Sequence, residues 1–267
     1  MSKKFAFLFV VVVLLWSAQN SRAAIQFSQQ LTSNVIYGTG NADGGFTVDR
    51  NVGQSLELGL RAHQRLPTTS DNAAGIKDQG NGDYGSFLAQ GWGAGNNRAS
   101  WNFDWSINTD YLGTSGVVVG ALRYLIEIDY NPGAATTFLS FDPLVAVPGS
   151  AFPDHSFGNN LTPNNGSALE ATSAANYTTL KNSNNVAQNS WQLQFFESPV
   201  TAFQHNPFAN GLYDVRLTAY NGATQLAQTQ IQVIVGLGAV PEPTAFLTWG
   251  GLMICGGLLS LRAKRFV

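Results

Sequence analysis

Alternation of apolar and polar residues is the dominant pattern between residues 24 and 239. In the segment 101–108, tryptophan, phenylalanine and isoleucine alternate with asparagine, aspartate and serine. Successive side chains of a β-strand point to opposite faces, so this segment predicts a strand with one apolar and one polar face. The same pattern predicts five further strands, at 56–63, 124–130, 191–195, 215–219 and 231–235.

Turn-forming residues separate these strands, and long polar loops connect some of them. The turn signals are Asn131-Pro132-Gly133, Asn164-Asn165-Gly166, Asn210-Gly211 and Asn221-Gly222. No long stretch has the 3.6-residue period of a helix, and the segments 63–100 and 148–190 are predicted to be long polar loops. We therefore expect an all-β fold, a β-sandwich whose core contains Trp101, Trp105 and Trp191.

The two last predicted strands form a hairpin with its own signature. Gly211-Leu212-Tyr213 opens the first of them, Asn221-Gly222 forms the turn, and an alternating strand ends at Val235. This segment resembles the final hairpin of immunoglobulin-like and PKD-like domains. The resemblance implies that Tyr213 is a corner residue whose hydroxyl returns to the backbone.

The N-terminus has the layout of a secretory signal peptide. Lys3 and Lys4 precede an apolar stretch from Phe5 to Trp16, and a polar stretch with small residues follows. Ser21 and Ala23 occupy the small-residue positions, so cleavage is expected after Ala23. The alternative is an N-terminal membrane anchor, although the apolar stretch is short for a span. The predicted exported domain is then 24–239, which is long enough for one large β domain.

The C-terminus combines three features that belong together. Val240-Pro241-Glu242-Pro243 is followed by an uncharged apolar run of 17 residues, 245–261, and by the basic tail 262–267 with Arg262, Lys264 and Arg265. The run is at the lower limit for a transmembrane helix, and the basic residues after it are expected to stay cytoplasmic. Cys255, the only cysteine, lies inside the run, where it fills lipid-facing space or accepts a lipid.

Residues 240–267 resemble the PEP-CTERM sorting signal of Gram-negative bacteria. The resemblance implies an inner-membrane intermediate, cleavage near Pro241-Glu242-Pro243 by an exosortase, and delivery to the cell surface or the extracellular matrix of a biofilm. It covers only the tail and implies nothing about the activity of 24–239.

The net charge of the predicted exported domain argues against polyanionic partners. Six of the 14 Lys and Arg residues lie in the two terminal signals, so 24–239 keeps 8 of them against 15 Asp and Glu, a net charge of −7. Such a domain repels nucleic acid and anionic lipid, so no nucleic-acid partner is expected.

No motif predicts catalysis or a cofactor. His63, His155 and His205 occupy polar contexts, and no serine lies in a Gly-x-Ser-x-Gly elbow. Asp154, His155 and Ser156 are adjacent in sequence, so they point in different directions and cannot form a triad by themselves. Glu127 and Asp129 share one strand face, as the acids of a glycosidase would, but a solvated polar face is the simpler explanation and the one we favour.

Two segments rich in Asp and Asn are candidates for calcium. Asp78, Asn81 and Asp83 supply oxygen ligands in a glycine-rich loop, and Asn41, Asp43 and Asp49 form a weaker set. The first set lacks the spacing and the bidentate glutamate of an EF-hand. Ion-free turns are the commoner outcome for such sequences, so no metal is expected.

Carbohydrate contact is the chemistry that the composition favours most. Trp92 lies between Gly91 and Gly93 in a predicted loop. An exposed indole there would stack on a sugar ring, and the commoner alternative is a hydrophobic plug that packs under the loop. We therefore expect a non-catalytic surface or matrix protein that binds exopolysaccharide. Two alternatives stay open: a secreted glycan hydrolase that uses Glu127 and Asp129, and a surface protein whose tail remains a permanent anchor.

Overall fold

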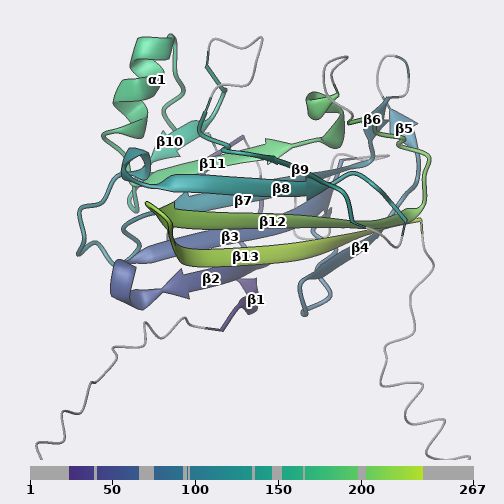
Figure 1. The fold of residues 1–267 in the computed structure, drawn as a ribbon, viewed down its shortest axis with the longest axis horizontal. Helices are drawn as coiled ribbons and strands as arrows, with labels where there is room; N and C mark the ends of the chain where they lie inside the picture. Colours follow the sequence, from purple (N-terminus) through teal and green to yellow (C-terminus); the bar gives the residue numbers. More distant parts are fainter. Residues whose placement is uncertain are drawn as a thin grey trace, which may run out of the picture.

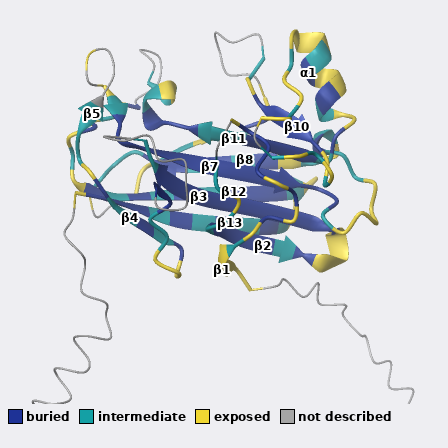
Figure 2. Cartoon of the chain, turned by 180° about the vertical axis from the view of Figure 1, so that it is seen from behind, coloured by how far each residue is buried: buried dark blue, intermediate teal, exposed yellow. Residues whose placement is uncertain are grey.

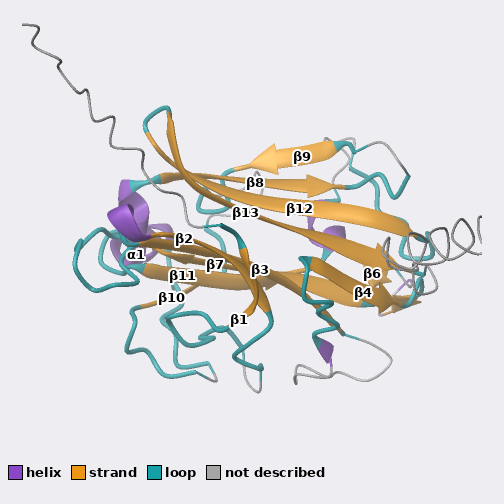
Figure 3. Cartoon of the chain, turned by 90° about the horizontal axis from the view of Figure 1, so that it is seen from below, coloured by secondary structure: helices purple, strands orange, loops and turns teal. Residues whose placement is uncertain are grey.

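The computed structural model describes residues 24–38, 41–65, 75–92, 95, 97–133, 136–145, 152–164, 166–197 and 203–236. Two β-sheets pack face to face, which confirms the predicted all-β sandwich (Figures 1 and 3). The predicted signal peptide at 1–23 and the tail at 240–267 lie outside the described residues. Among the residues that are described, no helix has the length and apolar character needed to span a membrane.

The larger sheet has six strands, all joined to their neighbours in antiparallel fashion. In spatial order they are β1 (Gln26–Gln29), β2 (Phe46–Asn51), β3 (Leu56–Gln64), β7 (Trp101–Asn108), β11 (Val186–Trp191) and β10 (Ser156–Gly158).

The smaller sheet has five strands. In spatial order they are β4 (Asp83–Phe87), β13 (Thr224–Val235), β12 (Gly211–Asn221), β8 (Arg123–Asp129) and β9 (Phe138–Phe141). Only the pair β4–β13 is parallel. The remaining elements are the small hairpin of β5 (Gly91–Trp92) and β6 (Arg98–Ala99), helix α1 (Ala174–Lys181), and the 3₁₀ turns η1 (Val52–Gln54), η4 (Val119–Ala121) and η5 (Leu193–Phe196).

The core lies between the sheets and is formed by the apolar members of each alternating strand. Leu60 of β3 pairs with Trp105 of β7, and both side chains are fully buried. Trp101 and Trp191 are buried as well, so the predicted placement of three tryptophans in the core is confirmed. Burial of such large side chains stabilises the fold by about 1.5–3 kcal/mol for each residue.

A segment before β2 covers the other face of the larger sheet. This segment, residues 31–38 and 41–45, is here called the strap. Its backbone is held by side chains of the sheet: Gln188 Oε1 accepts a hydrogen bond from the N–H of Ile36 at 2.9 Å, and Glu57 accepts one from the N–H of Thr32 at 3.0 Å. The polar face of the larger sheet is consequently buried, as the dark blue of β3 and β7 in Figure 2 shows.

Side chains of β2 close one side of the sandwich against β13. Asp49 accepts a hydrogen bond from the N–H of Gln228 at 2.7 Å, and the Thr229 hydroxyl donates to the carbonyl of Thr47 at 2.9 Å. The later half of β13 pairs with β4 instead. The backbone groups along this edge of β13 therefore have partners in both halves of the strand. β4 pairs with the later half, and side-chain hydrogen bonds join the earlier half to β2.

The predicted strand at 191–195 is wrong beyond its first residue. β11 ends at Trp191, and Leu193 and Phe195 belong to η5 rather than to a strand. A 3₁₀ turn has three residues per turn, so Leu193 and Phe196 point toward the core while Phe195, 57% exposed, faces outward. The 3₁₀ turn lets Phe196 pack against the core. The alternation of apolar and polar residues in 191–195 gives no sign of this contact, because Phe196 lies outside the alternating segment.

The two predicted long loops contain regular elements. Residues 63–100 include β4, β5 and β6, and residues 148–190 include β10, α1 and most of β11. Helix α1 begins at a Ser173 cap, whose side chain accepts from the N–H of Asn176. Only Tyr177 and Leu180 of this helix are buried, so its sequence has too few apolar residues to display a helical period.

Candidate functional site

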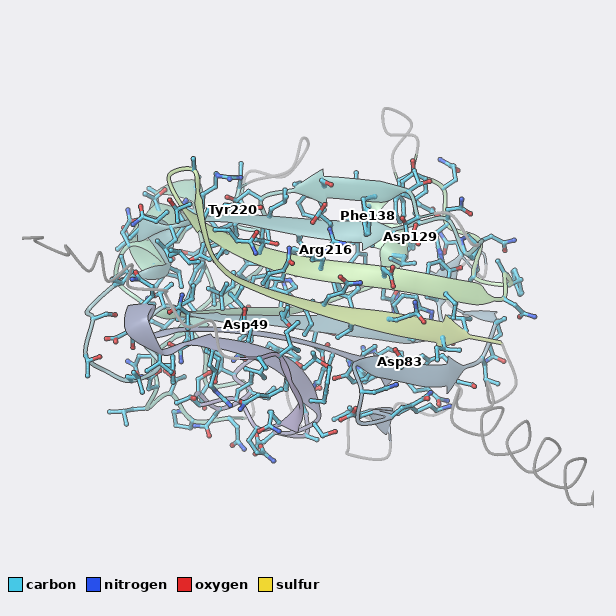
Figure 4. The ribbon with its side chains drawn as sticks, turned by 60° about the horizontal axis from the view of Figure 1, so that its bottom comes forward. Asp49, Asp83, Asp129, Phe138, Arg216 and Tyr220 are labelled. Atoms are coloured by element: carbon cyan, nitrogen blue, oxygen red, sulfur yellow. The ribbon has the colours of Figure 1, made fainter. Side chains whose placement is uncertain are left out.

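The outer face of the smaller sheet carries polar side chains from four of its strands, β8, β9, β12 and β13. We call it the open face. Its side chains alternate with the core residues of the same strands, and Figure 4 shows several of them. Its partly exposed polar and aromatic members are Arg123 and Glu127 of β8, Phe138 of β9, Asp214, Arg216 and Tyr220 of β12, and Gln228, Gln230 and Gln232 of β13. Leu125, Leu212, Thr218 and Ile234 lie on the same face, and Thr218 and Ile234 are buried.

Arg216 lies at the centre of the open face. Its guanidinium forms an ion pair with Glu127 at 3.1 Å and a hydrogen bond with Gln230 at 3.2 Å, and it lies over the ring of Phe138, 5.1 Å from the centroid. The side chains of Arg216 and Glu127 are 28% and 18% exposed. The pair therefore fixes the geometry of the face more than it stabilises the fold, because solvent screens it.

The rest of the open face is also ordered by pairs across strands. Arg123 lies over the ring of Tyr220, 4.2 Å from the centroid, while Gln232 donates to Asp214 at 3.1 Å. Two partly buried aromatic rings, Tyr220 and Phe138, thus lie on this sheet among amides, carboxylates and guanidinium groups. Such a surface offers apolar stacking together with many hydrogen-bonding groups, which is what a sugar chain needs.

Glu127 and Asp129 belong to one strand but have different partners and different exposure. Glu127 is paired with Arg216 on the open face. Asp129 is 1% exposed and accepts hydrogen bonds from the N–H groups of Asn131 and Thr137 at 3.0 and 2.8 Å. Asp129 therefore holds the connection between β8 and β9, and the two carboxylates have different partners.

Trp92 lies away from the open face. Its backbone belongs to β5 and pairs with Arg98 of β6, at one end of the sandwich (Figure 1). Its side chain is outside what the structure describes, so its predicted contact with glycan stays a prediction. The sorting motif Val240, Pro241, Glu242 and Pro243 and the basic residues Arg262, Lys264 and Arg265 lie outside the described residues too, as does Cys255.

The first calcium candidate is a tight turn closed by its own hydrogen bonds. Asp78 accepts from the N–H of Gly80 at 2.8 Å, and Asn81 donates its amide to Asp83 at 2.8 Å. An amide donor against a carboxylate takes the place that a cation would occupy. Over the described ranges, no group of three His, Cys, Asp or Glu side chains is arranged to hold a metal ion.

The second calcium candidate is dispersed among different partners. Asn41 donates to the carbonyl of Tyr37, and Asp43 accepts from Asn164. Asp49 accepts from the backbone of β13, as described above.

The three histidines occupy three different environments. His155 is fully buried beside Trp105, its Nδ1 is 2.8 Å from the hydroxyl of Tyr177, and burial lowers its pKa to about 3. Because the Tyr177 hydroxyl donates to the carbonyl of Leu144, it accepts from Nδ1 of a neutral His155. Burial likewise lowers the pKa of His205 to about 4. The side chains of Asp154 and Ser156 do not join His155 in a triad: Asp154 accepts from Asn189.

His63 belongs to a buried charge cluster beneath the strap. Its Nδ1 is 3.0 Å from Oδ2 of Asp104, which also accepts from Nε of Arg61 at 2.7 Å. Although burial raises the pKa of Asp104, the charges of His63 and Arg61 outweigh it and hold this pKa well below the usual range. Arg61 in turn donates to Tyr37 and to the carbonyls of Ala42 and Gly44, so the cluster fastens the strap.

Tyr213, the predicted corner residue, is buried in the core. Its ring lies 5.6 Å from that of Trp101 and 6.2 Å from that of His205. Among the described residues its hydroxyl makes no hydrogen bond to the backbone, in contrast to the arrangement that the resemblance implies.

Comparison with known proteins adds little to this picture. No protein family and no curated protein matches the sequence. The soluble domain of PmoD from Methylocystis sp., a crystal structure, aligns with 67% of this chain and 91% of its own length at 13% identity, with a TM-score of 0.25. A likeness of that degree supports no argument about fold or function, so the function is argued from the molecule itself.

Proposed function

We propose that this chain is an exported, non-catalytic β-sandwich that binds polysaccharide at the cell surface or in an extracellular matrix. The observation that supports this most directly is the open face, where Tyr220 and Phe138 flank a row of glutamine, aspartate and arginine side chains. The signals at both ends of the sequence supply the route: export, an inner-membrane stage held by 245–261, and processing at Pro241-Glu242-Pro243 by an exosortase.

The charge of the open face favours an uncharged polysaccharide. Arg123 and Arg216 are balanced by Glu127 and Asp214, and Asp83 stands at the β4 edge of the same sheet. With the domain at −7 overall, a polyanion is repelled, whereas neutral hexose units engage the rings and the amides without an electrostatic cost.

Co-sedimentation of purified 24–239 with an insoluble neutral glucan tests the binding, and release of soluble sugar is assayed in the same tubes. Retention without new fragments supports a binding protein. Loss of retention in Tyr220→Ala with Phe138→Ala, but not in Trp92→Ala, assigns the contact to the open face. The reverse result assigns it to Trp92, and new fragments indicate a hydrolase.

The route is tested separately. Replacing Pro241, Glu242 and Pro243 with alanine is expected to leave unprocessed protein in the inner membrane. Normal secretion of this variant would contradict the proposed processing site.

A further inference from the structure

Three glutamines form a line on the open face. Gln228, Gln230 and Gln232 occupy alternate positions of β13, so their side chains point to the same side, while Thr229 and Ile231 between them are buried. All three glutamines are partly exposed, and we call them the glutamine row. Alternate residues of a strand lie about 6.7 Å apart, so the row is about 13 Å long.

Charged partners on β12 fix which half of the amide two of these glutamines present. Arg216, directly opposite Gln230, donates to its Oε1 at 3.2 Å, and the Nε2 of Gln230 has no partner among the described residues. Asp214, directly opposite Gln232, accepts from its Nε2 at 3.1 Å, and here Oε1 is the atom without a described partner. Arginine only donates and an ionised carboxylate only accepts, so neither amide turns over without losing its partner. The row therefore presents a fixed donor next to a fixed acceptor.

The third glutamine is adaptable. Gln228 pairs with the hydroxyl of Thr218, which is buried, at 2.9 Å. Because a hydroxyl both donates and accepts, the amide of Gln228 is able to turn over and offer either its oxygen or its NH₂ group. The row thus has two fixed positions and one adaptable position.

An aromatic ring lies beside the row, on the side of β4. The carbonyl of Gly82 accepts from the N–H of Gln232 at 3.0 Å, which places this glycine next to the row. Gly82 has a φ of +93°, and a Cβ atom on it would lie 3.0 Å from the ring of Phe27 and 3.8 Å from the carbonyl oxygen of Gln230. The ring of Phe27 therefore packs directly against Gly82, and Phe27 is 38% exposed. Apolar surface thus adjoins the hydrogen-bonding groups of the row.

The charges around the row disfavour an acidic ligand. In the strand register Gln232 lies between Asp214 and Asp83, and Figure 4 shows Asp83 and Arg216 on the strands at either side of β13. A carboxylate or sulfate placed over Gln232 would face two acidic side chains and an amide oxygen. Arg216 does not compensate for them, because its guanidinium is already paired with Glu127 at 3.1 Å.

We propose that the glutamine row is the hydrogen-bonding subsite for a neutral glycan chain that lies along β13, with Phe27 beside it. This inference rests on the proposed polysaccharide binding. Sugar hydroxyls suit both fixed positions, since each one accepts from Gln230 or donates to Gln232. A pyranose unit with its glycosidic oxygen is about 5 Å long at ordinary covalent bond lengths, so about three units cover the row. The row therefore selects hydroxyl-bearing units over acidic ones and gives the ligand a minimum length.

A length series with the full chain, purified in detergent, tests the subsite. The probes are neutral glucan oligosaccharides of two to six units with β-1,4, β-1,3 or α-1,6 linkages, and calorimetric titration measures their affinity. Gln230→Ala and Gln232→Ala remove the fixed groups, and Gln230→Met keeps the size of the side chain in case an alanine variant misfolds. Gln54→Ala is the matched control, because it removes an exposed amide from η1. Denaturant unfolding checks that each variant is folded.

We expect weak binding of two units and a steep rise in affinity at about three units. Each glutamine variant should bind the longer chains about two- to twelvefold more weakly, while Gln54→Ala should bind like the wild type. Binding that neither glutamine variant weakens, or equal affinity for two units and for longer chains, overturns this inference and leaves the proposed function standing. A wild-type protein that binds none of the three linkages overturns both.

Discussion

The two sheets turn their polar faces to different surroundings. On the larger sheet, Arg61, His63 and Asp104 are at most 2% exposed beneath the strap. On the smaller sheet, Arg216 and Glu127 form a comparable ion pair that keeps 28% and 18% of its side chains exposed. Both arrangements arise from the same alternation of apolar and polar residues, and both put charges on the side opposite the core.

The difference shows that alternation fixes the side of a residue but not its exposure. A buried charge cluster has a large desolvation cost and needs every partner, while an exposed pair loses little when one member is removed. The covered face is therefore structural, and the open face is free to change its partners for a ligand.

Removal of Asp104 from the covered face is expected to have the largest effect on stability. Asp104→Ala leaves Arg61 and His63 buried without their carboxylate, so the free energy of unfolding should fall by about 3–5 kcal/mol. Glu127→Ala on the open face is the matched control and should cost less than about 1 kcal/mol. Chemical denaturation measures the free energy of unfolding of both variants. Similar losses would contradict the conclusion that the covered face stabilises the fold more than the open face does.

The free energy of unfolding should fall as the pH is lowered, because His155 is buried in its neutral form. Because burial lowers the pKa of His155 to about 3 in the folded state, against about 6.5 when unfolded, the unfolded chain binds the extra proton between these values. Stability is thus fully present above pH 6.5 and falls as the pH drops toward 3, by roughly 2–4 kcal/mol at pH 4. His155→Phe should flatten this dependence in denaturation curves; an unchanged slope would contradict it.

Loss of the aromatic rings of the open face should weaken glycan binding with little effect on folding. Tyr220→Ala and Phe138→Ala each remove one stacking surface, and we expect a loss of about 0.5–1.5 kcal/mol, or roughly two- to twelvefold in the dissociation constant. Binding isotherms on the neutral glucan measure this, with Val52→Ala, an exposed residue on η1, as a control. Equal affinity for all three variants would exclude the open face.

The smallest expected effect is at Arg216 itself. Arg216→Lys keeps the charge but loses the planar group that contacts Glu127, Gln230 and Phe138 together. Stability should change by less than about 1 kcal/mol, because the pair is exposed. Glycan affinity should fall by a larger factor than stability predicts; a fall in both by the same free energy would point to a purely structural role.

The sequence predicts the sandwich and its five longest strands because each of these strands places apolar residues on one face and mostly polar residues on the other. β3, β7, β8, β12 and β13 all show this period. The elements that it missed depend on tertiary contacts: β4 is a strand through its parallel pairing with β13, and η5 bends so that Phe196 reaches the aromatic core. Neither interaction leaves a periodic trace in the local sequence.

The open face was missed for a related reason. Glu127 was identified from the sequence, but its partner Arg216 is 89 residues away, and only the register of β8 against β12 brings them together. Polar residues at alternate positions of 214–220 and 228–232 were the available signal. Assigning them to one surface required the strand order, which alternation does not determine.

The hydrogen bonds between β2 and β13 have a consequence for the order in which the chain folds. Thr47 and Thr229 are 182 residues apart, and Asp49 and Gln228 are 179 apart, so the first and last long strands meet only when almost the whole domain is available. Folds with such distant contacts form slowly. A chain shortened before Thr224 would lack β13, and the edge of β12 would be left without its ladder partner and exposed to pairing with other chains. The sandwich is therefore completed only after β13, the last strand, has been synthesised and has packed against β2.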